Sequence, residues 1–390
     1  MNILFILKSL ETGGVEVVTA TLANKFKEEG HNVFLFSFSK GNNTIASQIT
    51  KVQVYIGDGF RITGKNVELV RQILVNEKID IIINQWGLPL VPIKVINKAR
   101  KGLGVKVISV FHNDPLQNGR VQNVALRIAG TKNLAKKLIL HIQKMLYRSI
   151  TGYSMRYIYQ QSNLFEVLSP SYVSHFQEFT WLNSTLRLAV QTNPITIDVS
   201  EFVYSPEKKR NEIIYVGRID YTQKRVCRII DIWALLKDKF QDWHLTIVGD
   251  GEERGNIERQ VENLKLERVN FEGFQQPRSY YERASILMLT SEFEGFPLVL
   301  AECMSFGVVP VVYGSYSAVY DIIDDGKDGV IIEKTVEGFN PTVMAERMSN
   351  LMTDRKRLNE MALAAIEKSK NYSVDIIYEQ WMAVLKDLVD

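Results

Sequence analysis

The stretch Ile286-Leu-Met-Leu-Thr-Ser-Glu-Phe-Glu-Gly-Phe-Pro-Leu-Val-Leu-Ala-Glu302 predicts a strand, a tight loop and the start of a helix in direct succession. Residues 286–290 form an apolar run typical of a short buried strand, and Pro297 suits the first position of a helix. Such a unit places free backbone N–H groups and the positive end of a helix dipole at the carboxyl end of a parallel strand. Open α/β sheets bind phosphorylated ligands at that place.

Two carboxylates in this stretch, Glu294 and Glu302, are separated by seven residues. They would repel a phosphate unless the ligand carries hydroxyl groups on both sides of its phosphates. A nucleoside diphosphate sugar has this order of parts, so Glu294 would accept hydrogen bonds from the sugar and Glu302 from the ribose. Either glutamate alone is equally explained as a solvated acid near the positive end of a helix. Gly295 and Pro297, which lie between them, favour the ligand site.

The chain has 390 residues, enough for two domains of about 190 residues each. No apolar stretch reaches the length of a membrane span, and residues 1–7 lack the basic start and the cleavage site of a signal peptide. The two cysteines, Cys227 and Cys303, fall in expected helices, which excludes a disulfide framework and a cysteine metal site and predicts a cytoplasmic location. Because metal loops, H-E-x-x-H and P-loop motifs are missing from the sequence, we expect no mandatory metal or cofactor.

Strands and helices alternate along both halves of the chain, which predicts an α/β fold with two doubly wound parallel sheets. The expected strands are 2–7, 32–38, 53–56, 79–84, 105–111, one near 166–168, 212–216, 244–248, 269–271, 286–290, 309–312 and 329–332. The expected helices include 15–29, 65–76, 226–236 and 373–388. A polar segment with a proline, 191–195, predicts a linker between the halves.

Residues 115–165 contain no Asp or Glu but eight cations: Arg120, Arg127, Lys132, Lys136, Lys137, Lys144, Arg148 and Arg156. Within this segment, apolar residues recur at helical spacing, at Leu134, Leu138, Ile142 and Met145. A basic amphipathic helix of this kind predicts peripheral contact with an anionic membrane. The alternative is an ordinary helix that buries its apolar stripe within its own domain. Nucleic acid is not an expected partner, because no nucleic-acid-binding motif accompanies the cations.

A glycine turn follows the first strand of each half. Gly13 and Gly14 would let a ligand approach the backbone where a helix start favours an anion, although a tight turn alone explains them as well. In the second half, Gly217 precedes Arg218 and Lys224, two cations that would neutralise the charge on a departing diphosphate. Surface salt bridges are the alternative use of these cations.

Other strands also end in candidate site residues. Gly249 and Phe274 follow strands of the second half and are expected to shape the edge of a nucleotide cleft and to hold a base through backbone groups. His112 follows the strand 105–111 and would face the reacting sugar, with the capping of a turn as the alternative. The run 84–87 ends a neighbouring strand and is expected on the acceptor side.

Together these residues resemble the family-4 glycosyltransferases of the GT-B type, which are retaining enzymes that use nucleotide sugars. The resemblance covers nearly the whole chain, and the string from Glu294 to Glu302 fits the specific E-x7-E signature of that family. It implies two facing Rossmann-like domains, over 1–190 and 191–372, and a last helix, 373–390, that crosses back to the first domain. The second domain would hold the donor, and the first would receive the acceptor.

By position, the resemblance implies catalytic roles for Glu294, Arg218, Lys224 and His112. It implies donor binding by Glu302, Gly13, Gly14, Gly217, Gly249, Phe274, Gly295, Phe296, Pro297, Leu298 and Val299. The membrane or acceptor side would carry Lys132, Lys136, Lys137, Lys144 and Arg148. The loop from Arg218 to Lys224 is one residue longer than in many members, which leaves the reach of the Lys224 side chain open.

The function that follows is transfer of a sugar, with retained anomeric configuration, from a UDP-sugar to a lipid-linked glycan in surface polysaccharide biosynthesis. The enzyme would work on the cytoplasmic face of the membrane. A glycosidase would use the two carboxylates as acid and nucleophile. The cations and the phosphate site beside Glu294 and Glu302 argue against that function. Two alternative functions stay open, because each also requires a nucleotide-sugar site. They are a non-catalytic nucleotide-sugar-binding subunit of a transferase complex and a GT-B sugar nucleotide epimerase.

Overall fold

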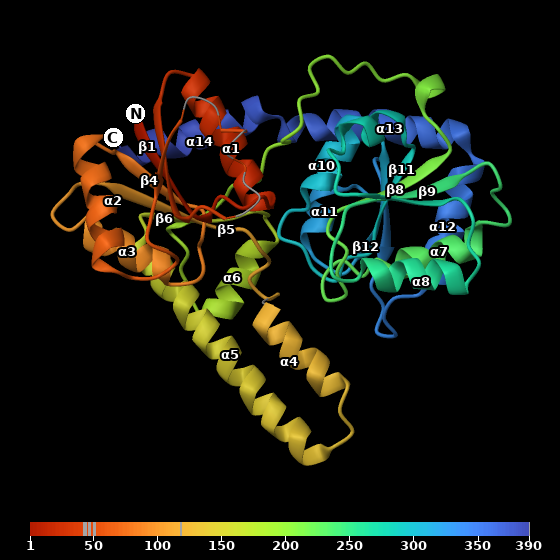
Figure 1. The fold of residues 1–390 in the computed structure, drawn as a ribbon, viewed down its shortest axis with the longest axis horizontal. Helices are drawn as coiled ribbons and strands as arrows, with labels where there is room; N and C mark the ends of the chain where they lie inside the picture. Colours follow the sequence, from red (N-terminus) through yellow and green to blue (C-terminus); the bar gives the residue numbers. More distant parts are fainter. Residues whose placement is uncertain (42–44, 46–47, 50–51, 118, 390) are drawn as a thin grey trace. The chain divides into compact units, whose positions relative to one another are not determined.

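The computed structural model describes residues 1–41, 45, 48–49, 52–117 and 119–389, and it divides into two compact units (Figure 1). Unit 1 comprises Met1–Thr196 and Ser373–Asp390, and unit 2 comprises Ile197–Tyr372. The polar segment 191–195 belongs to unit 1, where Gln191, Asn193 and Ile195 are buried. The boundary between the units lies between Thr196 and Ile197, one residue beyond the segment expected to be a linker.

Unit 1 is built on a seven-stranded sheet in the order β3-β2-β1-β4-β5-β6-β7. All neighbouring strands run parallel. A parallel sheet carries crossover helices on its faces, so its central strands are apolar on both sides, as the fully buried run of residues 3–7 shows. The strands are β1 (Asn2–Ser9), β2 (Asn32–Ser39), β3 (Gln53–Ile56), β4 (Ile81–Asn84), β5 (Lys106–Phe111), β6 (Leu164–Val167) and β7 (Leu188–Val190).

The helices of unit 1 include several that begin at polar caps. Thr63 accepts a hydrogen bond from the Asn66 N–H (3.1 Å), and Asn133 accepts one from the Lys136 N–H (3.0 Å). Both caps satisfy an N–H group that has no intrahelical partner. The helices are α1 (Gly14–Glu28), α2 (Gly64–Asn76), α3 (Val91–Ala99), α4 (Gly119–Ala129), α5 (Leu134–Gln161), α6 (Tyr172–Thr180) and α14 (Val374–Val389).

The last helix, α14, packs against α1 within unit 1. The Phe26 ring lies edge-on to Tyr378 (5.2 Å between centroids) and to Trp381 (6.5 Å). Lys25 Nζ reaches Asp375 Oδ1 at 2.5 Å. These aromatic contacts bury the apolar side of α14, so the C-terminal residues complete the core of the N-terminal unit.

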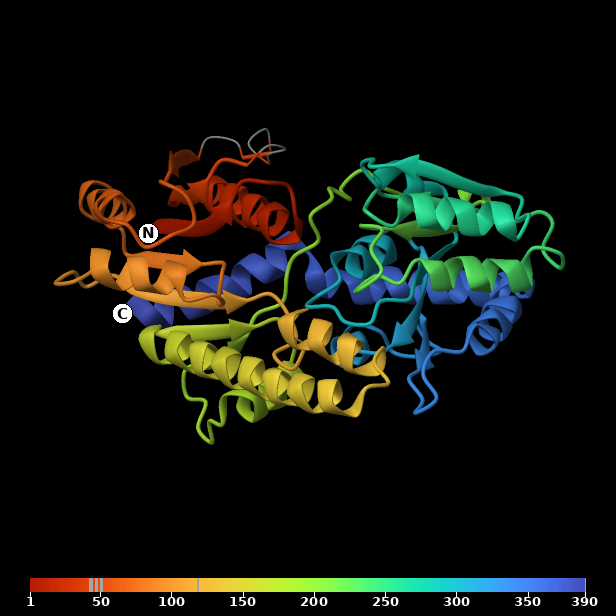
Figure 2. The ribbon, with the colours of Figure 1, turned by 60° about the horizontal axis from the view of Figure 1, so that its bottom comes forward.

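The acid-free segment forms two helices, α4 and α5, which lie side by side and extend away from the unit 1 sheet (Figures 1 and 2). The buried side chains Val121 and Val124 of α4 and Leu140 of α5 belong to this hairpin. The apolar stripe of α5 is not buried: Leu134 is 81% exposed, and Met145 is 70% exposed. The alternative of an ordinary helix that buries its stripe in its own unit is therefore wrong.

Unit 2 is a six-stranded parallel sheet in the order β10-β9-β8-β11-β12-β13. Its strands are β8 (Glu212–Val216), β9 (His244–Val248), β10 (Val269–Gly273), β11 (Ile286–Leu289), β12 (Val309–Gly314) and β13 (Val330–Glu333). Its helices are α7 (Cys227–Leu236), α8 (Arg254–Asn263), α9 (Arg278–Arg283), α10 (Leu298–Ser305), α11 (Ala318–Ile322), α12 (Pro341–Thr353) and α13 (Arg355–Ser369).

Both sheets reverse their strand order once, between β1 and β4 in unit 1 and between β8 and β11 in unit 2. Chain connections leave such a switch point on opposite faces of the sheet, which opens a crevice at the carboxyl ends of the two strands. The two sheets confirm the predicted fold class of two Rossmann-like doubly wound domains.

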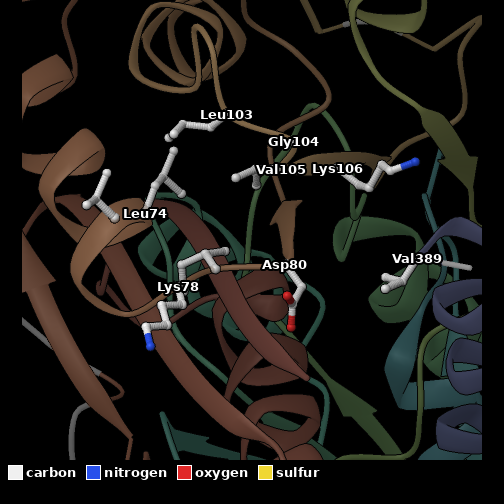
Figure 3. Close-up of a pocket in the computed structure, with 10 residues that line it drawn as sticks. Leu74, Lys78, Asp80, Leu103, Gly104, Val105, Lys106 and Val389 are labelled. Atoms are coloured by element: carbon white, nitrogen blue, oxygen red, sulfur yellow. The ribbon is translucent and has the colours of Figure 1, made fainter.

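A hollow of about 490 Å³ lies at the opposite, amino edge of the unit 1 sheet, where β4 and β5 begin (Figure 3). Its lining includes Leu74, Leu103 and Val389. Asp80, also in the lining, accepts a hydrogen bond from the Asn2 N–H at 2.8 Å. This hollow is thus remote from the switch point, and its carboxylate is already used to join two strands.

Glu166 on β6 makes the stability of the protein depend on pH. It is fully buried, neither carboxylate oxygen has a hydrogen-bond partner among the described residues, and burial raises its pKa to about 8. The folded chain therefore holds a proton that the unfolded chain releases above its ordinary pKa of 4.5. Stability is lost progressively as the pH rises from about 4.5 to about 8. Because Gln cannot ionise, the melting temperature of Glu166→Gln should fall less between pH 5 and pH 8 than that of the wild type.

The matched control is Glu379→Gln, at an exposed position of α14, which should follow the wild-type profile. Thermal melts over this pH range test the assignment. A parallel decline of the wild type and Glu166→Gln would contradict it.

Candidate active site

The central feature of unit 2 is an ion pair at its switch point. Lys224, in the loop after β8, places Nζ 2.6 Å from Oε1 of Glu294, in the loop after β11. The two side chains are only 15% and 7% exposed. The longer loop from Arg218 therefore does bring Lys224 to the signature glutamate, and a surface salt bridge is not the role of this lysine.

Two residues that the sequence analysis did not single out, Asp220 and Gln223, hold this pair. Asp220 Oδ1 accepts hydrogen bonds from the Gln223 N–H (2.7 Å) and the Lys224 N–H (3.3 Å), which fixes the loop. Gln223 Nε2 donates to Glu294 Oε2 (3.1 Å) and to the Phe293 carbonyl (3.1 Å). One amide thus orients the second oxygen of the glutamate. The only feature of the sequence that could have drawn attention to Asp220 and Gln223 is the length of their loop, which is one residue longer between Arg218 and Lys224 than in many family members.

Arg218 stands at the solvent side of the same loop. Its Nε donates to Asp220 Oδ2 at 3.0 Å, and its NH2 group donates to Gln223 Oε1 at 3.3 Å. The side chain is 66% exposed. The buried hydroxyl of Tyr215 donates to the Arg218 carbonyl (2.7 Å), which fixes the backbone beneath it. The guanidinium is therefore oriented by the loop and open to an anion.

Glu302 lies inside α10 and is buried. The hydroxyl of Tyr281, on α9, lies 3.3 Å from Glu302 Oε2 and donates to it. Burial raises the pKa of Tyr281 well above its ordinary value, so this hydroxyl keeps its proton. Lys209 Nζ in turn donates to the Tyr281 carbonyl at 2.7 Å. Tyr281 was another residue that no sequence motif indicated.

Helix α10 begins at Leu298, and Pro297 is its N-cap rather than its first helical residue. Proline lacks an N–H group and has no side-chain acceptor, so Pro297 supplies no cap of its own. The first N–H groups of the helix, from Leu298 and Val299, have no acceptor within the helix. The Phe296 ring packs against Tyr372 (5.4 Å between centroids) and anchors the turn that contains Gly295.

The glycines expected in the nucleotide cleft bring three loops into contact. A Cβ on Gly249 would lie 1.8 Å from the Gly217 carbonyl oxygen, and both residues have positive φ, +147° and +149°. The Gly249 N–H donates to the Gly273 carbonyl at 2.7 Å. Only glycine permits this approach, so Gly249 shapes the loop that carries Arg218. Phe274, after β10, is 63% exposed.

His112 lies in unit 1, after β5. Its Nε2 is 2.6 Å from Gln85 Oε1, and since that oxygen can only accept, Nε2 carries the proton. Burial lowers the pKa of His112 to about 3, so the imidazole is neutral at physiological pH. It offers a lone pair on Nδ1 and no positive charge.

The Gly13–Gly14 turn opens α1, and Gly13 is its N-cap. A Cβ on Gly13 would lie 2.7 Å from Glu16 Oε2. The Glu16 carboxyl therefore lies over the helix start, and burial raises its pKa to about 7. The place expected to favour an anion is already occupied by an acidic side chain of the chain itself.

The hairpin cations differ from one another. Lys132, Lys136, Lys137 and Lys144 have no ion-pair partner among the described residues. Arg148, expected to join them, instead pairs with Glu178 of α6 at 3.0 Å and lies over the Phe179 ring at 5.4 Å. Arg148 therefore anchors the hairpin to unit 1.

Within the part of the chain that the structure describes, no helix combines the length and the apolar character needed to cross a bilayer. Among the same residues, no group of three or more His, Cys, Asp or Glu side chains is placed to hold a metal ion.

Known families and proteins match both units. The family "Glycosyltransferase Family 4" matches residues 12–178, and the family "Glycosyl transferases group 1" matches residues 197–368. An uncharacterized glycosyltransferase of Haemophilus influenzae is 25% identical over 401 residues, which is 98% of each chain. The GalNAc-α-(1→4)-GalNAc-α-(1→3)-diNAcBac-PP-undecaprenol α-1,4-N-acetyl-D-galactosaminyltransferase of Campylobacter jejuni is 24% identical over 398 residues, 100% of this chain and 99% of the relative.

Among solved structures, the Anabaena protein HepE in complex with UDP-glucose has a TM-score of 0.75 and 17% identity, over 99% of this chain and 100% of HepE. This similarity shows the shared GT-B fold. Because the two family matches lie one on each unit, and Lys224, Glu294 and Glu302 occupy the switch point of the second, the chain belongs to the family-4 glycosyltransferases of the GT-B type.

Proposed function

We propose that this glycosyltransferase moves a sugar from a UDP-sugar to a lipid-linked glycan in surface polysaccharide biosynthesis, with retained anomeric configuration. The observation that carries the proposal is the buried pair of Lys224 and Glu294, oriented by Gln223 at the start of α10. The UDP-glucose complex of HepE and the undecaprenol-linked glycan in the name of the Campylobacter relative support the donor and acceptor classes.

The donor diphosphate is placed beside two cations and a helix start. Lys224 pairs with Glu294, and Arg218 is oriented but exposed. When the bond to the sugar breaks, negative charge develops on the diphosphate, and these groups stabilise it without having to reorganise. Two fixed cations provide what a metal ion would otherwise supply, so we propose that transfer needs no metal.

Glu294 accepts hydrogen bonds from the donor sugar and favours the positive charge of an oxocarbenium-like transition state. Lys224 and Gln223 donate hydrogen bonds to its two oxygens and so fix the orientation of the carboxylate. The leaving diphosphate accepts the acceptor proton on the face that it leaves, which retains the configuration. His112, neutral with a free lone pair on Nδ1, serves as a hydrogen-bond acceptor for a sugar hydroxyl.

The α4–α5 hairpin is the proposed contact with the membrane. The exposed apolar side chains of α5 lie on one side of the helix, with Leu138, Ile142 and Met145 at its centre. Lys132, Lys136, Lys137 and Lys144 complement anionic headgroups, which are concentrated on the cytoplasmic leaflet. A peripheral position on the inner face of the cell membrane would bring the enzyme to a lipid-linked acceptor.

The donor is tested by thermal shift with UDP, GDP and CDP, since a ligand stabilises the folded protein in proportion to its occupancy. We expect UDP alone to raise the melting temperature, with and without EDTA. A shift with GDP alone, or one that EDTA abolishes, would contradict the proposed donor or the metal-independent site.

Substitutions in the cradle test the catalytic assignment. Glu294→Gln keeps the shape but loses the charge and should lower kcat by about 100-fold or more, the typical cost of one preorganised electrostatic group. Gln223→Ala removes one hydrogen bond to Oε2 of Glu294 and should lower kcat roughly tenfold with little change in the KM for the donor. Purified protein, a UDP-sugar and release of UDP provide the assay, and proton NMR of the first product reports its anomeric configuration.

The matched control for these variants is Glu379→Gln, far from the cradle in the sequence and exposed on α14. Unchanged transfer by Glu294→Gln would remove the role assigned to that residue. An inverted anomeric centre would exclude retention.

Flotation with vesicles of phosphatidylglycerol and phosphatidylethanolamine tests the membrane contact. Replacing Lys136, Lys137 and Lys144 by Gln should weaken binding on the order of 100-fold, because each cation near an anionic surface contributes about 1 kcal/mol. The control replaces the exposed Lys94, Lys98 and Lys101 in the same unit and should bind like the wild type. Equal losses in both triple variants would show a general charge effect and not a docking hairpin.

A further inference from the structure

The carboxyl edge of the unit 1 sheet carries Lys8, Phe60 and Trp86, the last within the run 84–87 that was expected on the acceptor side. Lys8 comes near the end of β1, Trp86 follows β4, and Phe60 lies in the loop after β3. Lys8 and Trp86 thus flank the point where the strand order of the sheet reverses. Doubly wound sheets bind their ligands in the crevice at this point.

The aromatic residues form a continuous platform. Phe36 and Phe38 of β2 are fully buried, and their rings meet edge to face at 5.0 Å between centroids. Phe60 packs on Phe38 at 5.2 Å, and Trp86 packs on Phe60 at 6.3 Å. Phe60 and Trp86 are half-buried, so two supported rings reach the surface of the crevice.

A single exposed cation rests on these two rings. Lys8 Nζ lies 5.3 Å from the centroid of Trp86 and 5.6 Å from that of Phe60. The long lysine side chain is exposed and can swing aside to admit a ligand, after which its ammonium group becomes a hydrogen-bond donor to that ligand.

Buried polar atoms in the loops at the same edge of the sheet lack partners. Gln85 Nε2, Trp86 Nε1 and His112 Nδ1 are buried and have no hydrogen-bond partner among the described residues. Gln85 is only 2% exposed, and its oxygen is already used by His112. Unsatisfied buried groups are rare in native proteins and call for an explanation. Two N–H donors and one lone pair match the hydroxyl groups of a sugar, each of which both accepts and donates.

The charges at this edge disfavour an anionic ligand. Glu16 lies over the start of α1, and the charges of Lys8 and Glu11 both act on it. One lysine with two carboxyl groups in its neighbourhood is a poor site for a phosphate, whereas a neutral sugar ring needs no net positive charge.

We propose that Phe60 and Trp86 form a stacking platform for a sugar ring of the acceptor glycan, with Gln85, His112 and Lys8 as hydrogen-bonding groups around its edge. The aromatic faces contact the C–H faces of the ring, and the N–H groups of Gln85 and Trp86 donate to its oxygens. This inference rests on the proposed function, because it identifies the site in unit 1 that receives the acceptor. It names a neutral pyranose as the class of ligand.

Saturation-transfer NMR tests the platform directly, with the methyl α-glycosides of glucose, galactose, N-acetylglucosamine and N-acetylgalactosamine as probes. The wild type should transfer saturation from its aromatic protons to the ring C–H protons of at least one glycoside. Trp86→Ala and Phe60→Ala should each weaken that binding roughly tenfold, the order expected for an aromatic contact. Trp86→Phe keeps the ring, loses the N–H group and should bind at an intermediate level.

The matched control is Tyr153→Ala, which removes an aromatic side chain that is 70% exposed on α5 of the same unit. It should bind the glycosides like the wild type. No transfer to any glycoside, or equal transfer in Trp86→Ala and the wild type, would overturn the proposal. The thermal shift with UDP reports on the proposed donor site in unit 2, so it distinguishes that proposal from the sugar platform in unit 1. A UDP shift without glycoside binding refutes only the platform. A missing UDP shift refutes the donor site.

Discussion

The buried ion pair of Lys224 and Glu294 is the constraint around which unit 2 is arranged. Neither charge is tolerable alone at this depth, because removing one partner leaves the other without compensation. Asp220 fixes the loop that brings Lys224 there, Gln223 donates to the second oxygen of Glu294, and the close backbone approach at Gly249 supports the loop. These contacts hold the charged side chains in place without a ligand, as the proposed electrostatic catalysis requires.

The two units have the same sheet topology but carry different side chains at the place where a ligand would bind. Each has a parallel sheet whose strand order reverses once, and each gathers its polar side chains at the carboxyl ends of the two strands that flank the reversal. In unit 2 these are charged groups, suited to a diphosphate. In unit 1 they include aromatic rings, the neutral groups of Gln85 and His112, and one lysine that rests on the rings, a set suited to a sugar. The sheet topology determines where a ligand can bind, and the loop residues determine which ligand fits there.

The sequence predicted the strands well because buried parallel strands are continuous apolar runs, as 212–216 and 244–248 show. The signature from Glu294 to Glu302 pointed to the loop after β11 and to α10 because its spacing is local. Gln223 and Tyr281 could not be found in this way, since their contacts with Glu294 and Glu302 join distant parts of the chain. Asp220 acts within its own loop, on the N–H groups of Gln223 and Lys224, but no motif singles it out. The role of Arg148 depended on Glu178 of a later helix, which no helical periodicity reveals.

The return of α14 to unit 1 makes unit 2 an insertion between Thr196 and Ser373. During synthesis, unit 2 has all of its residues once Tyr372 has emerged from the ribosome, whereas unit 1 still lacks the helix that covers Phe26. Domains fold as units, usually the N-terminal one first. Here the order of completion is reversed: unit 2, which is second along the chain, is complete before unit 1, which still awaits the sixteen residues of α14.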